Sequence, residues 1–170
     1  MALVVKKLKA KDKIVKNHRT LSGILEGLRS QGKIVVMANG CFDLLHPGHV
    51  RCLEDAKSRG DFLVAVVHED KAATKIMGKG FPINEIEERM ETLSGLASVD
   101  YVTTCDDVTA EALVLLFQPQ MLAKGTGFTE RTTPERAAVK SIGSKVIICG
   151  DKKQRSAQKI VQRITKRKFE

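Results

Sequence analysis

Short runs of apolar residues alternate with amphipathic stretches along most of this chain. Ile34–Ala38 and Phe62–Val67 are continuously apolar, which is typical of strands buried on both faces of a parallel sheet. By the same pattern, shorter strands are expected at Val99–Thr103, Met121–Ala123 and Lys145–Cys149. Five strands joined by helical crossovers predict an α/β fold built on a doubly wound five-stranded parallel sheet.

Apolar residues at helical spacing predict helices in the connections between these strands. The first helix is expected to end at Gly32, and the second to begin with Pro47 and to close at Gly60. Asn84 and Glu87 have the spacing of a capping box, so a further helix is expected to begin at Asn84. The expected helices are Leu21–Arg29, Pro47–Arg59, a stretch from Asn84, Ala110–Phe117, Thr133–Ser141 and Ser156–Lys166.

Composition places the chain among globular proteins. It has 170 residues, of which 42% are apolar and 29% charged, as expected for one domain. No apolar run approaches the roughly 20 residues that a membrane-spanning helix needs. The N-terminus is too rich in lysine for a signal peptide, so a cytoplasmic protein is expected. The four cysteines show no CxxC spacing, which favours free thiols in a reducing compartment.

The formal net charge of +9 is concentrated at the two ends of the chain. Residues 1–19 and 151–170 each carry a net charge of +6, whereas residues 20–150 carry −3. Solvated basic ends explain this distribution more simply than a nucleic-acid interface, so nucleic acid is not an expected partner. The expected organisation is a basic arm at 1–19 and a single domain at 20–166, with a basic C-terminal helix and a tail to residue 170.

The segment after the first strand holds two histidines, His46 and His49, in a His-Pro-Gly-His sequence. They lie just past the carboxyl end of a strand, at the first turn of the next helix. The helix N-terminus adds free N–H groups and a positive dipole end, and Gly48 leaves room for a ligand near the backbone. Two imidazoles in this setting predict a site that stabilises phosphate oxygens during nucleotidyl or phosphoryl transfer. His18 and His68 have no such setting.

The string Asn39-Gly-Cys-Phe-Asp-Leu-Leu-His-Pro-Gly-His49 resembles the HxGH signature of a nucleotidyltransferase superfamily with a Rossmann-like fold. That superfamily includes cytidylyltransferases, adenylyltransferases and class I aminoacyl-tRNA synthetases. More narrowly, the string is similar to that of bacterial D-glycero-β-D-manno-heptose 1-phosphate adenylyltransferases, and the similarity extends from about Leu21 to Ile164. It includes the stretches Gly32–Val36, Pro82–Asn84, Glu88–Met90, Val99–Val102 and Lys124-Gly125.

This resemblance implies a reaction in which ATP and a sugar 1-phosphate form a nucleotide-sugar and pyrophosphate, with Mg²⁺ neutralising the charge of the leaving group. It implies that His46 and His49 stabilise the transferring phosphate and the leaving group. Candidates for binding the substrate or its phosphate are Lys75 and Lys79, in an expected loop before Asn84, and Arg89 in the helix that follows. No cluster of side chains indicates a metal site. The implied nucleotide-binding residues are Gly40, Cys41, Phe42, Asp43, Gly48, Lys124, Gly125 and Ser156.

Some of these residues also have a structural interpretation. Asp43 would then form a turn, Arg89 a surface ion pair and Ser156 a helix N-cap. The chain also departs from the family at positions around the nucleotide core, which leaves the acceptor and, to a lesser extent, the nucleobase open. These departures are Gly80-Phe81-Pro82, Lys124-Gly-Thr-Gly-Phe128 and Ser156-Ala-Gln158.

Several alternatives to a heptose-type enzyme therefore stand. A cytidylyltransferase for glycerol phosphate or another alcohol phosphate, and an FAD synthase that adenylylates FMN, fit the same signature. From a different class, a non-catalytic nucleotide- or nucleic-acid-binding protein would account for the basic ends and the altered segment at 156–158. Family members are often dimers, so the resemblance leaves a homodimer open.

Overall fold

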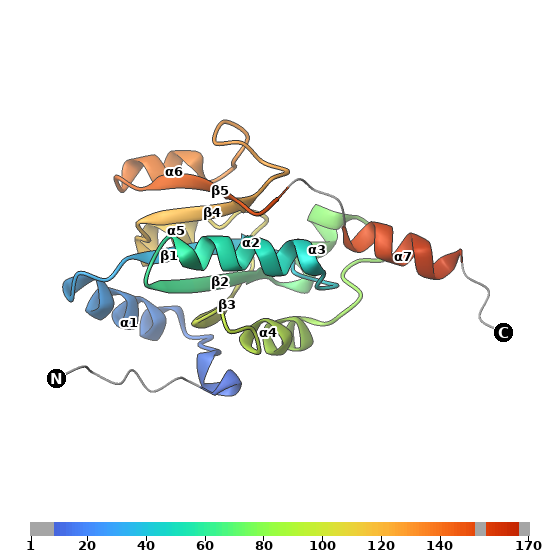
Figure 1. Ribbon diagram of the computed structural model, residues 1–170, viewed down its shortest axis with the longest axis horizontal. Coiled ribbons are helices and arrows are strands. Elements are labelled where there is room, and N and C mark those ends of the chain that lie inside the picture. The colour runs from blue at the N-terminus through green and yellow to red at the C-terminus, as the bar shows by residue number, and fades with distance from the viewer. Residues whose placement is uncertain (1–8, 152–155, 167–170) are drawn as a thin grey trace.

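The structure, a computed structural model, describes residues 9–151 and 156–166 (Figure 1). The described residues form a five-stranded parallel sheet in the order β3-β2-β1-β4-β5. The chain moves outward from β1 to β3 and then returns to place β4 on the other side of β1, so the strand order switches between β1 and β4. The strands are β1 Val35–Gly40, β2 Phe62–His68, β3 Tyr101–Cys105, β4 Met121–Gly125 and β5 Lys145–Cys149.

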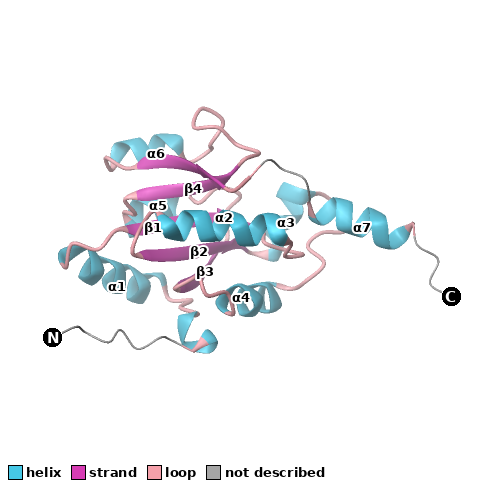
Figure 2. Cartoon of the chain, in the orientation of Figure 1, coloured by secondary structure: helices cyan, strands magenta, loops and turns pink. Residues whose placement is uncertain are grey.

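Helices cover both faces of the sheet (Figure 2). One apolar cluster joins the sheet to α1, α5 and α6, and the other joins it to α2 and α4. Alternate residues of β1 serve the two sides, because Val35 and Met37 belong to the first cluster and Val36 and Ala38 to the second. The helices are α1 His18–Ser30, α2 Pro47–Ser58, α3 Asp70–Met77, α4 Ile86–Ser94, α5 Glu111–Phe117, α6 Arg136–Ser141 and α7 Ala157–Thr165, preceded by the 3₁₀ turn η1 Ala10–Lys13.

The predicted doubly wound sheet is confirmed, and each expected strand and helix is present; β5 has the expected bounds and the others have shifted ends. The prediction of a loop between β2 and Asn84 is wrong, because α3 lies there. This helix buries only the small side chains of Ala72 and Ala73, so it lacks the stripe of large apolar residues that identifies a helix in sequence. The expected capping box is also displaced by one residue, since Glu88 accepts from the Glu85 backbone N–H at 3.0 Å.

The stretch before α1 lies along the edge strand β3. Ile14 forms a parallel bridge to Val102, and the Val15 N–H donates to the Val102 carbonyl at 2.9 Å. Lys13 is buried, and its ammonium donates to the Leu96 carbonyl at 2.8 Å. The described part of the expected basic arm therefore covers a sheet edge that would otherwise be open to pairing with another chain. Residues 1–8 of that arm and the tail at 167–170 lie outside the described residues.

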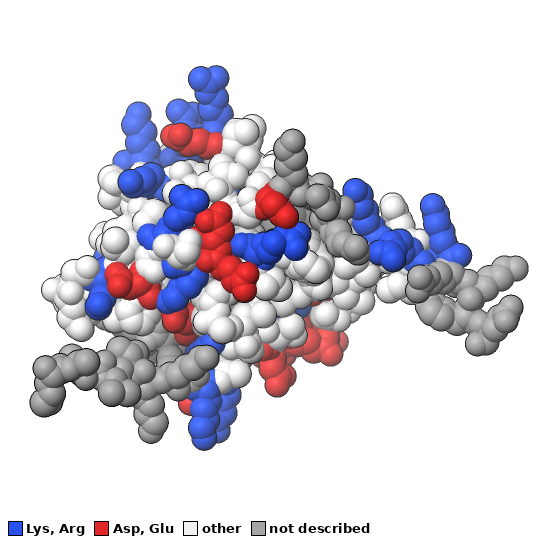
Figure 3. Space-filling model, viewed as in Figure 1, with Lys and Arg blue, Asp and Glu red and all other residues white. Residues whose placement is uncertain are grey.

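Charged side chains are spread over the molecule in Figure 3, with both signs over α2 and basic side chains along α7. Those on α7 are Lys159 and Arg163, which continue into Lys166 after the helix. Among the described helices, none is both long enough and apolar enough to cross a membrane.

Candidate active site

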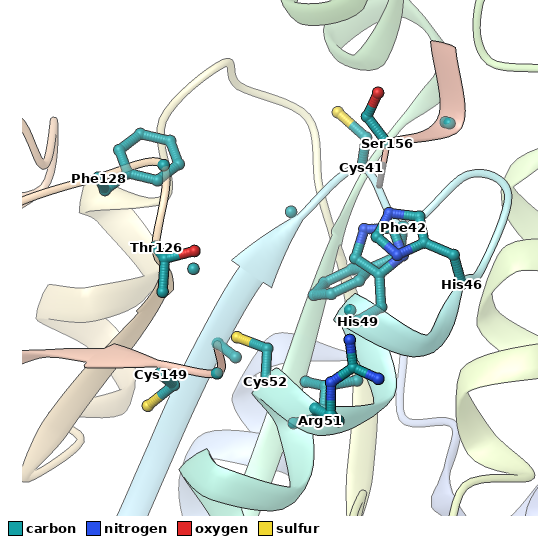
Figure 4. Close-up of a pocket in the computed structure, with 18 of the residues that line it drawn as sticks. Cys41, Phe42, His46, His49, Arg51, Cys52, Thr126, Phe128, Cys149 and Ser156 are labelled. Carbon is teal, nitrogen blue, oxygen red and sulfur yellow. The ribbon is translucent and has the colours of Figure 1, made fainter. Parts of the chain in front are cut away.

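A pocket of about 380 Å³ opens beyond the carboxyl ends of β1, β4 and β5 (Figure 4). Its walls come from the β1–α2 segment, the loop after β4, the end of β5, the end of α3 and the start of α7. Because the strand order switches between β1 and β4, this is the place where doubly wound sheets bind their ligands. Among the predicted nucleotide-binding residues, Gly40, Cys41, Phe42, Asp43, Gly48, Gly125 and Ser156 line the pocket, together with His46 and His49.

The two signature histidines form one stacked unit in the pocket. His46 is the N-cap of α2, whose first residue is Pro47, and His49 follows in the first turn. Their rings stack with centroids 3.8 Å apart and an interplanar angle of 21°. Phe42 supports the pair, since its ring meets that of His49 edge-on at a centroid distance of 5.7 Å. The side chains therefore reach the pocket as a pair with a fixed relative orientation.

Two glycines create the space that this arrangement needs. A Cβ atom on Gly48 would lie 3.0 Å from both Cε1 and Nδ1 of His46, so the missing side chain makes room for the imidazole ring. A Cβ atom on Gly40 would lie 3.2 Å from Cε2 of Phe42, whose backbone has a positive φ of 47°. Gly48 also lines the pocket, as the sequence predicted. Its main effect in this structure is to leave space for the His46 ring.

Asp43 lines the pocket and also ties the signature segment to the chain before α4. Its side chain is buried, and its two carboxylate oxygens accept from the Ile83 and Asn84 backbone N–H groups, each at 2.8 Å. The Asn84 side-chain amide donates to the Asp43 carbonyl at 3.4 Å. Asp43 therefore clamps two loops together more than it forms a local turn.

Arg89, expected near the substrate, lies in the core next to the site and does not line the pocket. Its guanidinium donates to the carbonyl oxygens of Cys41 at 2.6 Å, His68 at 2.8 Å and Asn84 at 3.0 Å. It also pairs with the Asp70 carboxylate at 2.6 Å. Since Arg89 is fully buried, it makes no surface ion pair of the expected kind, but joins the signature segment to β2, α3 and the segment before α4.

Lys124 lies behind one pocket wall. Its ammonium donates to Oδ1 of Asn39 at 2.7 Å and pairs with Oε2 of Glu135 at 2.8 Å, where the two charged side chains are 5% and 1% exposed. The ammonium also lies 5.1 Å from the centroid of the Phe128 ring, which lines the pocket. Gly125 reaches the pocket itself, so in this structure Lys124 supports the wall and its neighbour forms it.

The remaining predicted lysines lie outside the pocket. Lys75 is on α3 and Lys79 in the turn after it, and both are exposed. The residues of this region that line the pocket are Ile76 and Met77, so its contribution to the wall is apolar. Ser156 does line the pocket and is also the N-cap of α7.

Three cysteines, Cys41, Cys52 and Cys149, contribute to the pocket as free thiols. Burial raises the pKa of Cys41 and of Cys52 to about 11, and that of Cys149 to about 12. These side chains are therefore neutral at physiological pH and are not prepared as nucleophiles.

His18 and His68 have partners away from the pocket, in keeping with their lack of a motif. The His18 Nε2 atom is 3.0 Å from the Thr104 carbonyl, and the His68 Nδ1 atom is 2.8 Å from the Asp107 carbonyl. Burial lowers the pKa of His68, which favours its neutral form.

Sequence reasoning missed Arg51 and Asp151, which both line the pocket and form an ion pair at 2.9 Å. Thr126, which also lines the pocket, donates its hydroxyl to the Asp151 carbonyl at 2.8 Å. Their sequence positions could have identified them, because Arg51 comes two residues after His49 on α2 and Asp151 two residues after the end of β5. Both positions lie beyond the carboxyl ends of the strands, where sheets of this kind bind their ligands.

Within residues 9–151 and 156–166, no group of three or more His, Cys, Asp and Glu side chains could hold a metal ion. Mg²⁺ commonly binds through substrate phosphates with few protein ligands, so the pocket is compatible with an ion carried by a nucleotide.

Two curated relatives illustrate the similarity to known proteins. The bifunctional protein HldE of Pseudomonas aeruginosa strain LESB58 is 37% identical over 143 residues, which are 84% of this chain and 30% of that protein. Bifunctional protein HldE of Geobacter sulfurreducens is 38% identical over 155 residues, which are 91% of this chain and 32% of that protein. The chain thus spans about a third of the length of the curated relatives it matches.

A solved structure and a family model also match this chain. The lipopolysaccharide core biosynthesis protein from Thermoplasma volcanium has a TM-score of 0.62 and 29% identity, covering 71% of this chain and 99% of that one. Residues 37–169, which include the histidine pair and all the pocket walls, match the cytidylyltransferase-like family. The chain belongs to this cytidylyltransferase-like family of nucleotidyltransferases.

Proposed function

We propose that this nucleotidyltransferase transfers AMP from ATP to a sugar 1-phosphate of the heptose type and releases pyrophosphate. The observation that carries the proposal is the stacked pair of His46 and His49 at the start of α2, in a pocket at the switch point of the sheet. The resemblance of the signature segment to heptose 1-phosphate adenylyltransferases supports the choice of acceptor. So does the similarity to a lipopolysaccharide core biosynthesis protein.

In the proposed reaction, an oxygen of the acceptor phosphate attacks the α-phosphorus of the nucleotide in line. A P–O bond to the acceptor forms while the bond to the β-phosphate oxygen breaks, and the electron pair leaves with pyrophosphate. The transition state spreads negative charge over phosphate oxygens, so catalysis depends on positioned hydrogen-bond donors more than on covalent chemistry. His46 and His49 donate to these oxygens, and the N-terminus of α2 adds the positive end of the helix dipole.

Mg²⁺ is the proposed cofactor and would enter with the triphosphate. It would neutralise charge on the β- and γ-phosphates and so make pyrophosphate a better leaving group. The protein residues would hold the nucleotide, and the ion would be bound mainly by phosphate oxygens and water.

A second acceptor class is favoured by the apolar part of the wall. Ile76 and Met77 line the pocket at the end of α3, and Phe128 lines it after β4. The lysines next to them, Lys75 and Lys79, are exposed outside it. Such a wall suits an acceptor with a planar, apolar portion, such as the ring system of FMN.

Two further proposals concern the compartment and the oligomeric state of the protein. The four free thiols support a reducing compartment such as the cytoplasm. A homodimer stays a prediction from the resemblance alone, to be checked by the mass of the protein in solution.

The experiment is a pyrophosphate-release screen with ATP and CTP against heptose 1-phosphate, glycerol phosphate, other alcohol phosphates and FMN. Release with ATP that depends on heptose 1-phosphate is the expected result. Release with ATP and FMN, or with CTP and an alcohol phosphate, would replace the acceptor while keeping the reaction class. If a protein that binds nucleotide released no pyrophosphate with any pair, the result would favour a non-catalytic binding protein.

A further inference from the structure

The ion pair between Arg51 and Asp151 lies in the nucleotide pocket, although nothing in the signature segment requires it. We propose that Arg51 binds the polyphosphate of the nucleotide, and that Asp151 holds Arg51 in place until the nucleotide arrives. This role rests on the proposed nucleotidyl transfer, because it needs a nucleoside triphosphate in this pocket.

Arg51 is placed to reach the phosphates. It projects from the second turn of α2, two residues after His49. It lines the pocket together with His46 and His49, and Figure 4 shows these three side chains at the start of α2. A planar guanidinium can bind two phosphate oxygens at once, which an imidazole cannot do. Arg51 would thus add a bidentate contact to those of the two histidines.

Arg51 brings a positive charge to the lining of the pocket. Among the described residues that line the pocket, Arg51 is the single Lys or Arg side chain. Lys124 and Arg89 lie nearby, but both are buried in ion pairs of their own and neither lines the pocket. A triphosphate brings about four negative charges, so a pocket that binds it needs a cation beyond the two imidazoles and the bound Mg²⁺.

The Arg51–Asp151 pair is suited to be exchanged. The two side chains are 47% and 50% exposed, so water screens their attraction and the pair contributes little to stability. By contrast, the buried Lys124–Glu135 pair would leave an uncompensated charge if it opened. A triphosphate offers Arg51 more charge than one carboxylate does, and the exchange therefore favours the nucleotide.

The backbone around Asp151 is fixed from two sides, which keeps its carboxylate beside the pocket. The Asp151 carbonyl accepts from the Thr126 hydroxyl at 2.8 Å, and the Gly150 N–H donates to Oδ2 of Asp55 at 2.9 Å. The other Asp55 oxygen accepts from Arg59 at 3.0 Å. Asp55 is thus occupied, and Asp151 is the acidic side chain positioned to hold Arg51.

This arrangement makes opposite predictions for the two partners. Removing the Arg51 charge should weaken nucleotide binding, because a phosphate contact is lost. Removing the Asp151 charge should strengthen it, because Arg51 no longer has a competing partner. A purely structural ion pair would give effects of the same sign for both substitutions.

The test measures binding of ATP and CTP, with Mg²⁺ and without acceptor, to wild type, Arg51→Gln, Asp151→Asn and the double variant. Asp151→Asn should bind the triphosphate several-fold more tightly than wild type. The double variant should bind roughly tenfold to a hundredfold more weakly than Asp151→Asn, as expected for loss of a charge-assisted hydrogen bond. Lys33→Gln is the matched control, since it removes one positive charge from an exposed ion pair with Asp61 outside the pocket and should bind as wild type does.

Inorganic tripolyphosphate separates phosphate binding from base binding. The same ranking of variants with tripolyphosphate supports the proposal, whereas a loss seen only with ATP and CTP would place Arg51 at the base and overturn it. Equal affinities of Asp151→Asn and the double variant would show that Arg51 merely neutralises Asp151. A folded wild type that binds neither nucleotide would overturn the proposed function as well. Thermal melting of each variant shows that the fold is kept.

Discussion

At the scale of single residues, the pocket depends on groups that shape the histidine pair as much as on the histidines. His46 folds back over the start of α2, where the missing Cβ atom at position 48 gives its ring space. Phe42 supports the other ring of the pair from the side. The HxGH pattern thus encodes a geometry, in which glycine positions one imidazole and the helix turn positions the other.

Gly48→Ala tests this geometry without removing a functional group. The new methyl would meet the His46 ring at 3.0 Å, so the ring must move. We expect kcat to fall about threefold to tenfold, because the ring has to give way by a few tenths of an ångström, whereas a displacement near 1 Å can cost about a hundredfold. The measurement is steady-state pyrophosphate release, together with the melting temperature.

Gly27→Ala is the control for that variant. Gly27 lies within α1, and a Cβ atom there would meet nothing within 4 Å. This variant should be more stable by about 0.5–1 kcal/mol and equally active. Wild-type turnover in Gly48→Ala would mean that the position of His46 is unimportant.

Sequence patterns were more informative about which residues gather than about which way they point. The signature residues were predicted to form a pocket, and Gly40 to Asp43, Gly48, Gly125 and Ser156 line it. The direction of a long side chain depends on neighbours that are distant in sequence, and for this reason Arg89 was placed at the substrate and Arg51 was missed. Arg89 contacts residues 5 to 48 positions away, which no local pattern records.

At the scale of elements, two buried polar groups fasten the signature segment to its surroundings. Asp43 accepts from the two backbone amides before α4, and Arg89 on α4 donates to the Cys41 carbonyl. The pocket wall formed by the end of α3 is joined to this unit through the pair of Arg89 with Asp70. A shift of α4 would therefore displace the signature segment that carries the histidine pair.

Asp43→Ala should destabilise the protein by about 2 kcal/mol, because it removes the acceptor of two part-buried backbone N–H groups. The free energy of unfolding from urea titration measures the loss. Asp106→Ala, at an exposed position, should change it by less than about 0.5 kcal/mol. A loss no larger for Asp43→Ala than for Asp106→Ala would show that the clamp carries no stability.

The elements themselves were largely predictable because each is either a continuous apolar run or an amphipathic stripe. α3 was not, since its buried residues are two alanines and its larger apolar residues, Ile76 and Met77, line the pocket instead of the core. Ends of elements shifted for a similar reason: β1 continues through Asn39 and Gly40, whose pairing with β2 depends on the sheet and not on apolar character.

At the scale of the whole molecule, the buried pair of Lys124 and Glu135 links β4 to the start of α6, on the far side of the switch point from β2. Burial alone would raise the pKa of Glu135, but the Lys124 ammonium and hydrogen bonds bring it below its ordinary value. The folded state therefore prefers the ionised carboxylate, and its contribution to stability is present above the ordinary pKa of Glu and lost as the pH falls through the lower folded value.

Glu135→Gln should cost about 3–5 kcal/mol near neutral pH, because it leaves the Lys124 charge buried without its partner. Its free energy of unfolding should also fall less between pH 5 and pH 3 than that of wild type, since the carboxylate that must take up a proton is gone. Chemical denaturation across this range measures both effects. Parallel curves for the two proteins would contradict the assigned pKa direction.

The central claim is that the stacked histidines catalyse nucleotidyl transfer. The most direct measurement is the pyrophosphate-release rate of His46→Ala and His49→Ala against wild type, with the nucleotide and acceptor that wild type uses. The account predicts a loss of about a hundredfold or more in each variant, at an unchanged melting temperature, because each removes a donor to the transition state. Wild-type rates in either folded variant would contradict it.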